Sequence, residues 1–98
     1  MPKIEKMSEL FVVREPVHGM AVRLDSRQWY RHILWEHEEL APRLHDVAET
    51  VSQPDLVLRS KYRGDTWLYH KLLPDRRRYM CVAVRLVYND AGEREGFM

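Results

Sequence analysis

The chain has 98 residues, which is the length of one domain and too short for two independent hydrophobic cores. Apolar residues make up 45% of it and charged residues 32%, as in an ordinary globular protein with a well-solvated surface. Sixteen Lys and Arg against fifteen Asp and Glu leave a net charge of +1, so the overall charge does not indicate a nucleic-acid binder. We therefore expect residues 1–98 to form a single domain in which any basic surface comes from local arrangement.

The single cysteine, Cys81, excludes an internal disulfide and a multi-cysteine zinc site, and it suits a reducing compartment. It lies in an apolar run, so we expect it to be buried as a small hydrophobic residue. Residues 1–6 have no apolar core like that of a secretory signal, and no apolar stretch approaches membrane-spanning length. These features predict a cytoplasmic protein that does not enter a membrane.

The first two predicted elements are strands that form a hairpin. Residues 10–15 are a β-branched and aromatic run that stops at Pro16, and Gly19 closes a turn. Residues 20–25 then alternate, with one face made of Met20, Val22 and Leu24.

Two helices are predicted next. Ser26 is a suitable N-cap for a helix that begins at Arg27, and helical spacing continues through Tyr30, Ile33, Leu34 and His37. Pro42 ends this helix and suits the first turn of a second one, which runs to about Gln53 before Pro54. The second helix has the apolar stripe Leu44, Val47, Ala48 and Val51.

Beyond Pro54 the sequence returns to strand periodicity. Strands are predicted at 56–59, 66–72 and 79–88, with turns around Gly64 and Asp65 and around Pro74 and Asp75, and a last strand begins at residues 95–98. The predicted fold is α+β, with two N-terminal strands, two helices, and then an antiparallel β-meander packed on the helices. The final strand looks truncated.

The helices need an apolar sheet face, which assigns the side chains of Met80, Val82, Val84 and Leu86 to the core. We expect the opposite face to carry cations alternating with aromatic rings, namely Arg23, Arg59, Trp67, Tyr69, Lys71, Tyr79 and Arg85. Such a mixture suits single-stranded nucleic acid, because bases stack on rings while cations hold phosphates. A water-facing sheet also shows these residue types without any ligand.

Arginine and histidine residues outside the strands add candidates. The run 76–78, with Arg77 at its centre, is either a phosphate clamp or a solvated loop. His32 and His37 lie on different faces of the predicted first helix, which disfavours a two-histidine metal site, and we predict no metal and no cofactor. Each histidine either transfers protons near neutral pH or simply caps or packs the helix end.

The stretches 29–40 (WYRHILWEHEEL) and 47–55 (VAETVSQPD), followed by a hairpin and a hydrophobic strand, resemble a family of small phage and bacterial nucleases grouped with barnase, EndoU, colicin and RelE toxins. The resemblance covers roughly residues 26–98. It implies two helices before a four-stranded antiparallel meander. It also implies metal-independent RNA cleavage, often by a toxin or phage-conflict component restrained by an antitoxin or immunity protein.

The resemblance implies a catalytic set of His37, His32, Lys71, Tyr69 and Arg85. The histidines would transfer protons, Lys71 and Arg85 would stabilise phosphate charge, and Tyr69 would stack or donate a proton. The remaining nucleic-acid contacts are expected at Trp67, Arg59, Arg23, Tyr79 and Arg77. The family usually continues the last strand, and here its polar groups are absent.

The alternative is a noncatalytic module related to such nucleases. In that hypothesis the open sheet, or the edge beside residues 95–98, binds protein or RNA, or pairs with a second copy in a homodimer.

Overall fold

The computed structural model describes residues 9–33, 42–73 and 78–98 of the chain. In these ranges the strands are β1 (Glu9–Arg14), β2 (Ala21–Asp25), β3 (Leu56–Arg59), β4 (Thr66–Leu72), β5 (Tyr79–Tyr88) and β6 (Arg94–Phe97). The helical segments are α1 (Ser26–Gln28), η1 (Trp29–Ile33) and α3 (Leu44–Ser52). The predicted α+β class and order are confirmed, and strand limits differ from prediction by no more than one residue.

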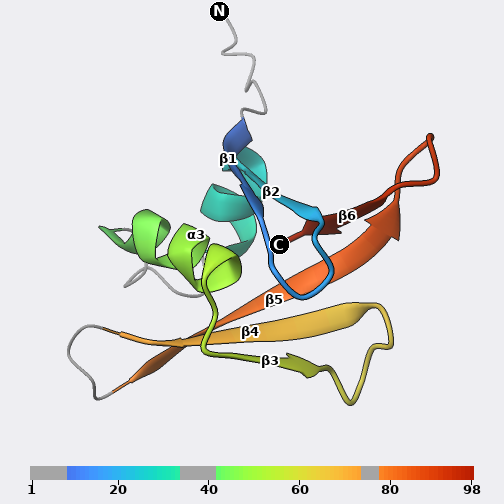
Figure 1. The fold of residues 1–98 in the computed structure, drawn as a ribbon. Helices are drawn as coiled ribbons and strands as arrows, with labels where there is room; N and C mark the ends of the chain where they lie inside the picture. The colour runs from blue at the N-terminus through green and yellow to red at the C-terminus, as the bar shows by residue number, and fades with distance from the viewer. Residues whose placement is uncertain (1–8, 34–41, 74–77) are drawn as a thin grey trace, which may run out of the picture.

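All six strands join one sheet in the order β1-β2-β6-β5-β4-β3 (Figure 1). Strands β3 to β6 form the predicted antiparallel meander, and β1 and β2 form the predicted hairpin. The two parts are joined because β2 pairs in parallel with β6, which the sequence did not predict.

β6 therefore lies inside the sheet, with β2 on one side and β5 on the other. The prediction of an open edge beside residues 95–98, and of a dimer through it, is wrong, because β1 and β3 are the edge strands. Gly96 allows this close insertion, since a Cβ atom there would approach Val84 Cγ1 to 2.7 Å and Val22 Cγ2 to 2.9 Å.

One face of the sheet, here called the core face, is covered by α3 and by the β1–β2 turn, which crosses in front of β5 toward β4 (Figure 1). The buried hydrophobic residues gather there, and they include Met20, Val22, Leu24, Trp29, Val47, Val51, Met80, Val82 and Val84. Leu86 is partly buried and packs against them. The core faces predicted for β2 and β5 are thus confirmed. We call the other side of the sheet the open face.

The helices begin differently from prediction. Asp25, and not Ser26, caps α1, because its Oδ1 accepts a hydrogen bond from the Gln28 backbone N–H at 2.7 Å. Residues 34–41 of the expected first helix lie outside the described residues. α3 begins at Leu44 and ends at Ser52, within the predicted limits, and its buried residues include Val47 and Val51 from the predicted stripe.

A buried carboxylate fixes the β1–β2 turn on the core. The Glu15 side chain has no exposed surface, and it accepts hydrogen bonds from the backbone N–H groups of Val17 at 2.8 Å, His18 at 2.7 Å and Met20 at 3.1 Å. The Tyr69 hydroxyl donates a fourth bond at 2.9 Å. These bonds place the turn directly over β4.

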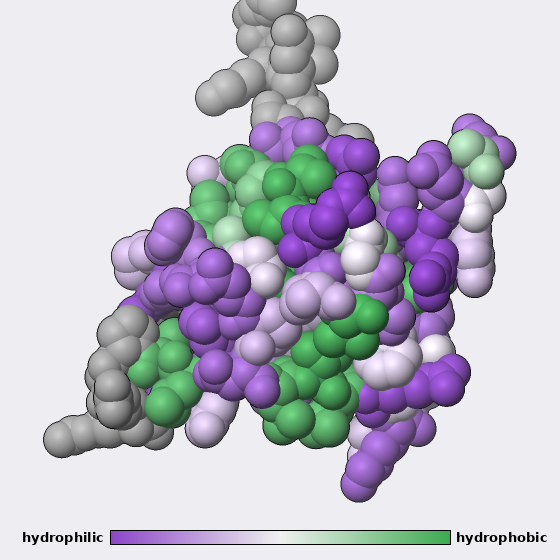
Figure 2. Space-filling model, in the orientation of Figure 1, coloured by the Kyte–Doolittle hydropathy of each residue, from purple (hydrophilic) through white to green (hydrophobic). Residues whose placement is uncertain are grey.

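Seen from the side of α3, the helix surface is hydrophilic, while hydrophobic side chains gather near β1 and around β3 (Figure 2). No helix in the described ranges has the length and apolar character needed to cross a membrane.

Candidate nucleic-acid interface

The sheet does not bring together the strand residues of the predicted catalytic set. Tyr69 pairs with Val82 and Lys71 pairs with Met80, so both side chains project from the core face. Arg85 belongs to the other set of β5 residues, with Tyr79, Cys81 and Ala83, and projects from the open face. The prediction that Trp67, Tyr69 and Lys71 share a surface with Arg85 is wrong.

Tyr69 is fully buried, and its hydroxyl is committed to Glu15. Burial, and then the hydrogen bond and charge of Glu15, raise the pKa of Tyr69 well above its usual value. In this state the ring cannot stack on a base and the hydroxyl does not face solvent. The sequence misled us because β4 carries large side chains on both faces, and its alternation fits either orientation.

Three other predicted residues lie on the side of the core face. Lys71 Nζ donates a hydrogen bond to the Gln53 carbonyl at 2.8 Å, beside the end of α3. The Trp67 ring packs edge-on against His18, with 4.6 Å between ring centroids, and the Arg59 guanidinium carbon lies 5.9 Å from the Trp67 ring centroid. Trp67 thus stabilises the β1–β2 turn and is not part of an open stacking platform.

The remaining predicted residues have mixed outcomes. His37 and Arg77 lie outside the described residues, and the side chain of His32 does too. Tyr79 lies on the open face with 61% of its surface exposed. Cys81 is exposed on the same face, so the prediction of a buried cysteine is wrong.

The open face does combine cations with an aromatic ring, but through a residue that the sequence did not indicate. Phe97 on β6 is 39% exposed and pairs with Arg23 on β2 and with Arg85 on β5. Directly opposed side chains on neighbouring strands lie about 5 Å apart at Cβ. We call Arg23, Phe97 and Arg85 the arginine–phenylalanine row.

Carboxylates hold both arginines of the row. Arg23 Nη1 bonds Glu9 Oε1, and Arg23 Nη2 lies 3.6 Å from Glu95 Oε1. The bond to Glu9, and then the charges of both carboxylates, raise the pKa of Arg23. Arg85 Nε donates to Asp65 Oδ2 at 3.0 Å. Because these pairs are solvent-exposed, each is worth little and can exchange for another anion.

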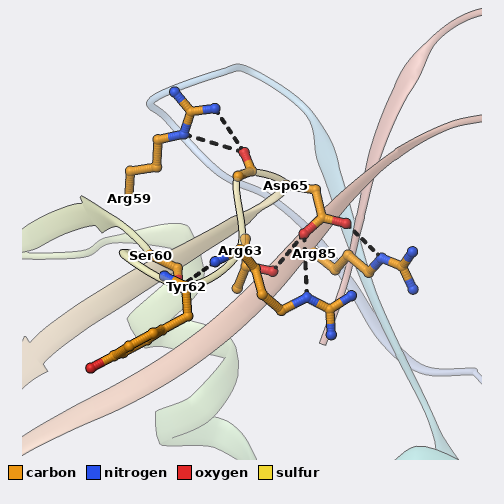
Figure 3. A network of polar contacts seen from close by, with 8 residues as sticks. Arg59, Ser60, Tyr62, Arg63, Asp65 and Arg85 are labelled. Atoms are coloured by element: carbon orange, nitrogen blue, oxygen red, sulfur yellow. Dashed lines mark hydrogen bonds and ion pairs between the residues drawn. The ribbon is translucent and has the colours of Figure 1, made fainter.

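Asp65 connects the row to the β3–β4 loop, residues 60–65 (Figure 3). Its Oδ1 accepts a hydrogen bond from the Thr66 hydroxyl at 3.0 Å and lies 3.6 Å from Arg63 Nε. The Thr66 bond, and then Arg85 and Arg63, hold the pKa of Asp65 below its usual value. One carboxylate thus orients two guanidinium groups.

The loop itself is ordered by short-range bonds. Arg59 donates from Nε and Nη2 to the Gly64 carbonyl at 3.2 and 2.9 Å, and Ser60 Oγ accepts from the backbone N–H groups of Tyr62 and Arg63. The Tyr62 side chain extends away from this polar cluster and is 94% exposed (Figure 3). The loop therefore presents an unburied aromatic ring.

Residues 59–66 together with Arg85 carry four cations, Arg59, Lys61, Arg63 and Arg85, against one carboxylate, Asp65. The excess of cations lies in the loop, while Arg59 lies on the side of the core face and Arg23 of the row is held by Glu9 and Glu95. The signal for this excess was the segment RSKYRGD at 59–65, of which we predicted only Arg59 as a nucleic-acid contact and only a turn around Gly64 and Asp65. Within the described ranges, no group of three or more His, Cys, Asp or Glu side chains is arranged to hold a metal ion.

No protein-family model matches the chain, and neither the curated proteins nor the solved structures contain a match. The resemblance to small nucleases therefore stays a prediction.

Proposed function

We propose that this protein binds single-stranded RNA through the arginine–phenylalanine row and the β3–β4 loop, without cleaving it. The observation that carries the proposal is the position of Phe97, a half-exposed ring in the sheet surface with an arginine opposite it on each neighbouring strand. Sheet surfaces that bind single strands use exposed rings for bases and cations for the backbone.

The contacts suggest a path for the strand. A base stacks on Phe97. The adjacent phosphates replace the carboxylates as the partners of the Arg23 and Arg85 guanidinium groups. From Arg85 the strand reaches Arg63, because Asp65 already holds these two arginines together. Tyr62, with its ring exposed, offers a second stacking position beside Lys61.

Binding is favoured over catalysis because the expected reaction centre is not assembled in the described residues. Tyr69 and Lys71 are separated by the sheet from Arg85, and the Tyr69 hydroxyl is satisfied by a buried carboxylate. The cleavage prediction for His32 and His37 stays a prediction, since their side chains lie outside the described part of the chain.

The test is fluorescence anisotropy of a labelled, short single-stranded oligouridylate titrated with the full chain in EDTA. We expect salt-dependent binding, and a loss of at least about fivefold in affinity for Phe97→Ala, since stacking on one ring contributes roughly 1–3 kcal/mol. Arg85→Ala should also flatten the dependence of log affinity on log salt by about 0.7, which corresponds to one phosphate contact on a single strand.

Matched controls lie away from the row. Tyr88→Ala removes a ring that is 68% exposed at the end of β5, and Arg27→Ala removes an exposed cation on α1. Both should leave the affinity unchanged. Equal losses in the controls and in Phe97→Ala would contradict the proposal, and cleaved oligonucleotide in EDTA would restore the nuclease hypothesis.

A further inference from the structure

The open face has a second region, beyond the arginine–phenylalanine row, where the side chains are apolar except for the His70 imidazole and the Tyr79 hydroxyl. Leu56 and Leu58 on β3 pair with His70 and Leu68 on β4, and these pair with Cys81 and Ala83 on β5. Leu72 and Tyr79 form the next opposed pair. We call these residues the apolar patch: Leu56, Leu58, Leu68, His70, Leu72, Tyr79, Cys81 and Ala83.

The patch is exposed where a sheet normally shows polar residues to water. Leu56 is 50% exposed, Leu58 48% and Tyr79 61%. Cys81 and Ala83 are exposed as well, and Leu68, His70 and Leu72 are half-buried. None of the eight is Asp, Glu, Lys or Arg. The sheet thus has apolar side chains on both faces at this end, while in the described part of the chain α3 and the β1–β2 turn cover only one of them.

We propose that the apolar patch is the contact surface of a homodimer, in which the open faces of two chains pack against each other. A two-fold interface packs the same patch of both chains together. A patch whose charges have one sign would therefore repel its own copy. This patch has no carboxylate, ammonium or guanidinium group to be left unpaired, and apolar sheet faces pack on each other at about 10 Å.

The size of the patch is consistent with a second copy. Eight side chains with these exposures present on the order of 500 Å², so two copies bury about 1,000 Å² in total, which is roughly the lower limit for a specific interface. RNA is a poor occupant, because the patch offers no cation for phosphate. Dimerisation does not depend on the proposed RNA binding, and the two are measured separately.

The first test is the mass of the full chain in solution, measured by sedimentation equilibrium over a range of concentrations. We expect a reversible monomer–dimer equilibrium with dimer predominating at high concentration. Ala83→Glu places a carboxylate within the patch and should weaken dimerisation at least tenfold. Leu58→Glu should act in the same way from the neighbouring edge strand.

Val12→Glu is the matched control. Val12 is 43% exposed on β1 and opposes Arg23 on the open face, outside the patch. This variant should dimerise like the original chain. Circular dichroism identifies any variant that fails to fold. The dimerisation of a patch variant is compared with that of the original chain only if the variant is folded. A monomer at all concentrations, or equal weakening by Val12→Glu, would overturn the proposal.

Cys81 gives a readout that needs no substitution in the patch. It is exposed in the single chain and lies within the patch. Its alkylation by a maleimide should slow several-fold as the protein concentration rises through the dimer transition. A rate that does not change with concentration, in a preparation that sedimentation shows to be dimeric, would place the interface elsewhere.

Discussion

At the scale of single residues, the contact between Glu15 and Tyr69 connects two distant parts of the chain through a buried hydrogen bond. It joins the β1–β2 turn to the middle of β4, across a long separation in the sequence. Burial alone would raise the pKa of Glu15, but hydrogen bonds from Met20, Tyr69, His18 and Val17 outweigh it and lower the pKa. The carboxylate is therefore held ionised inside the fold.

Glu15→Gln should lower the free energy of unfolding at neutral pH by about 1–3 kcal/mol, because an amide accepts through only one oxygen and turns a donor toward N–H groups. Tyr69→Phe should cost a similar amount, since it removes one of four donors to a buried charge. Urea denaturation measures both. Glu93→Gln, at an exposed position, is the control and should be neutral.

The same site predicts a pH dependence of stability. The folded-state pKa of Glu15 lies below the ordinary carboxyl value of 4.5, so its stabilising contribution is present above that value and is lost as pH falls through the folded-state pKa. The difference in unfolding free energy between the original chain and Glu15→Gln should therefore be constant near neutral pH and shrink below about pH 4.5. A difference that grows on acidification would contradict this assignment.

Prediction from sequence at the residue scale failed where a polar side chain is buried. Nothing in the alternation of β4 shows that Tyr69 points inward, because Leu68 and Leu72 on the opposite set are equally suited to a core. The deciding partner, Glu15, lies far away in the sequence. Charged residues are almost never fully buried unless paired, so a sequence pattern places Glu15 at the surface.

At the scale of elements, β6 shows what the sequence can and cannot specify. Strand limits followed from period-two alternation, and the core faces of β2 and β5 followed from their apolar sets. The position of β6 between β2 and β5 could not be predicted in this way, because the pattern of a four-residue strand is too weak to indicate which strands it pairs with. As a result Phe97 was interpreted as part of an unfinished edge, although it is the central ring of the candidate interface.

Gly96→Ala tests the tight packing of β6. The added Cβ would lie 2.7 Å from Val84 Cγ1 and 2.9 Å from Val22 Cγ2, and β-branched side chains in strands have little freedom to move. We expect a loss of about 1–3 kcal/mol in the free energy of unfolding. Gly64→Ala is the matched control, because its Cβ would meet only Arg59 Nη2, at 3.4 Å. Thermal denaturation of the two variants should differ clearly.

At the scale of the whole molecule, the open face is divided between two chemistries. The arginine–phenylalanine row lies on β2, β6 and β5, and the apolar patch lies on β3, β4 and β5. Ala83 and Arg85 are two residues apart on β5 and mark the boundary. A dimer through the patch therefore brings two copies of the row into one particle.

This arrangement predicts avidity. RNA long enough to reach both rows should bind the original chain at least tenfold more tightly than a short oligomer, because the second contact is intramolecular. Leu56→Glu, at the end of β3 away from both the row and the β3–β4 loop, should weaken dimerisation, keep the short-RNA affinity and lose most of this advantage. Anisotropy with the two RNA lengths measures the ratio, and an unchanged ratio in the variant would show that the rows act independently.

The position of β6 also has a consequence for the order of folding. The β1–β2 hairpin and the β3–β5 meander can each form from neighbours along the chain, whereas β6 joins them by pairing with β2 from the far end of the sequence. Contacts of such high sequence separation are slow to form. A nascent chain on the ribosome would thus hold two half-sheets that share no strand pairing, with the inner edges of β2 and β5 unpaired, until residues 94–97 emerge.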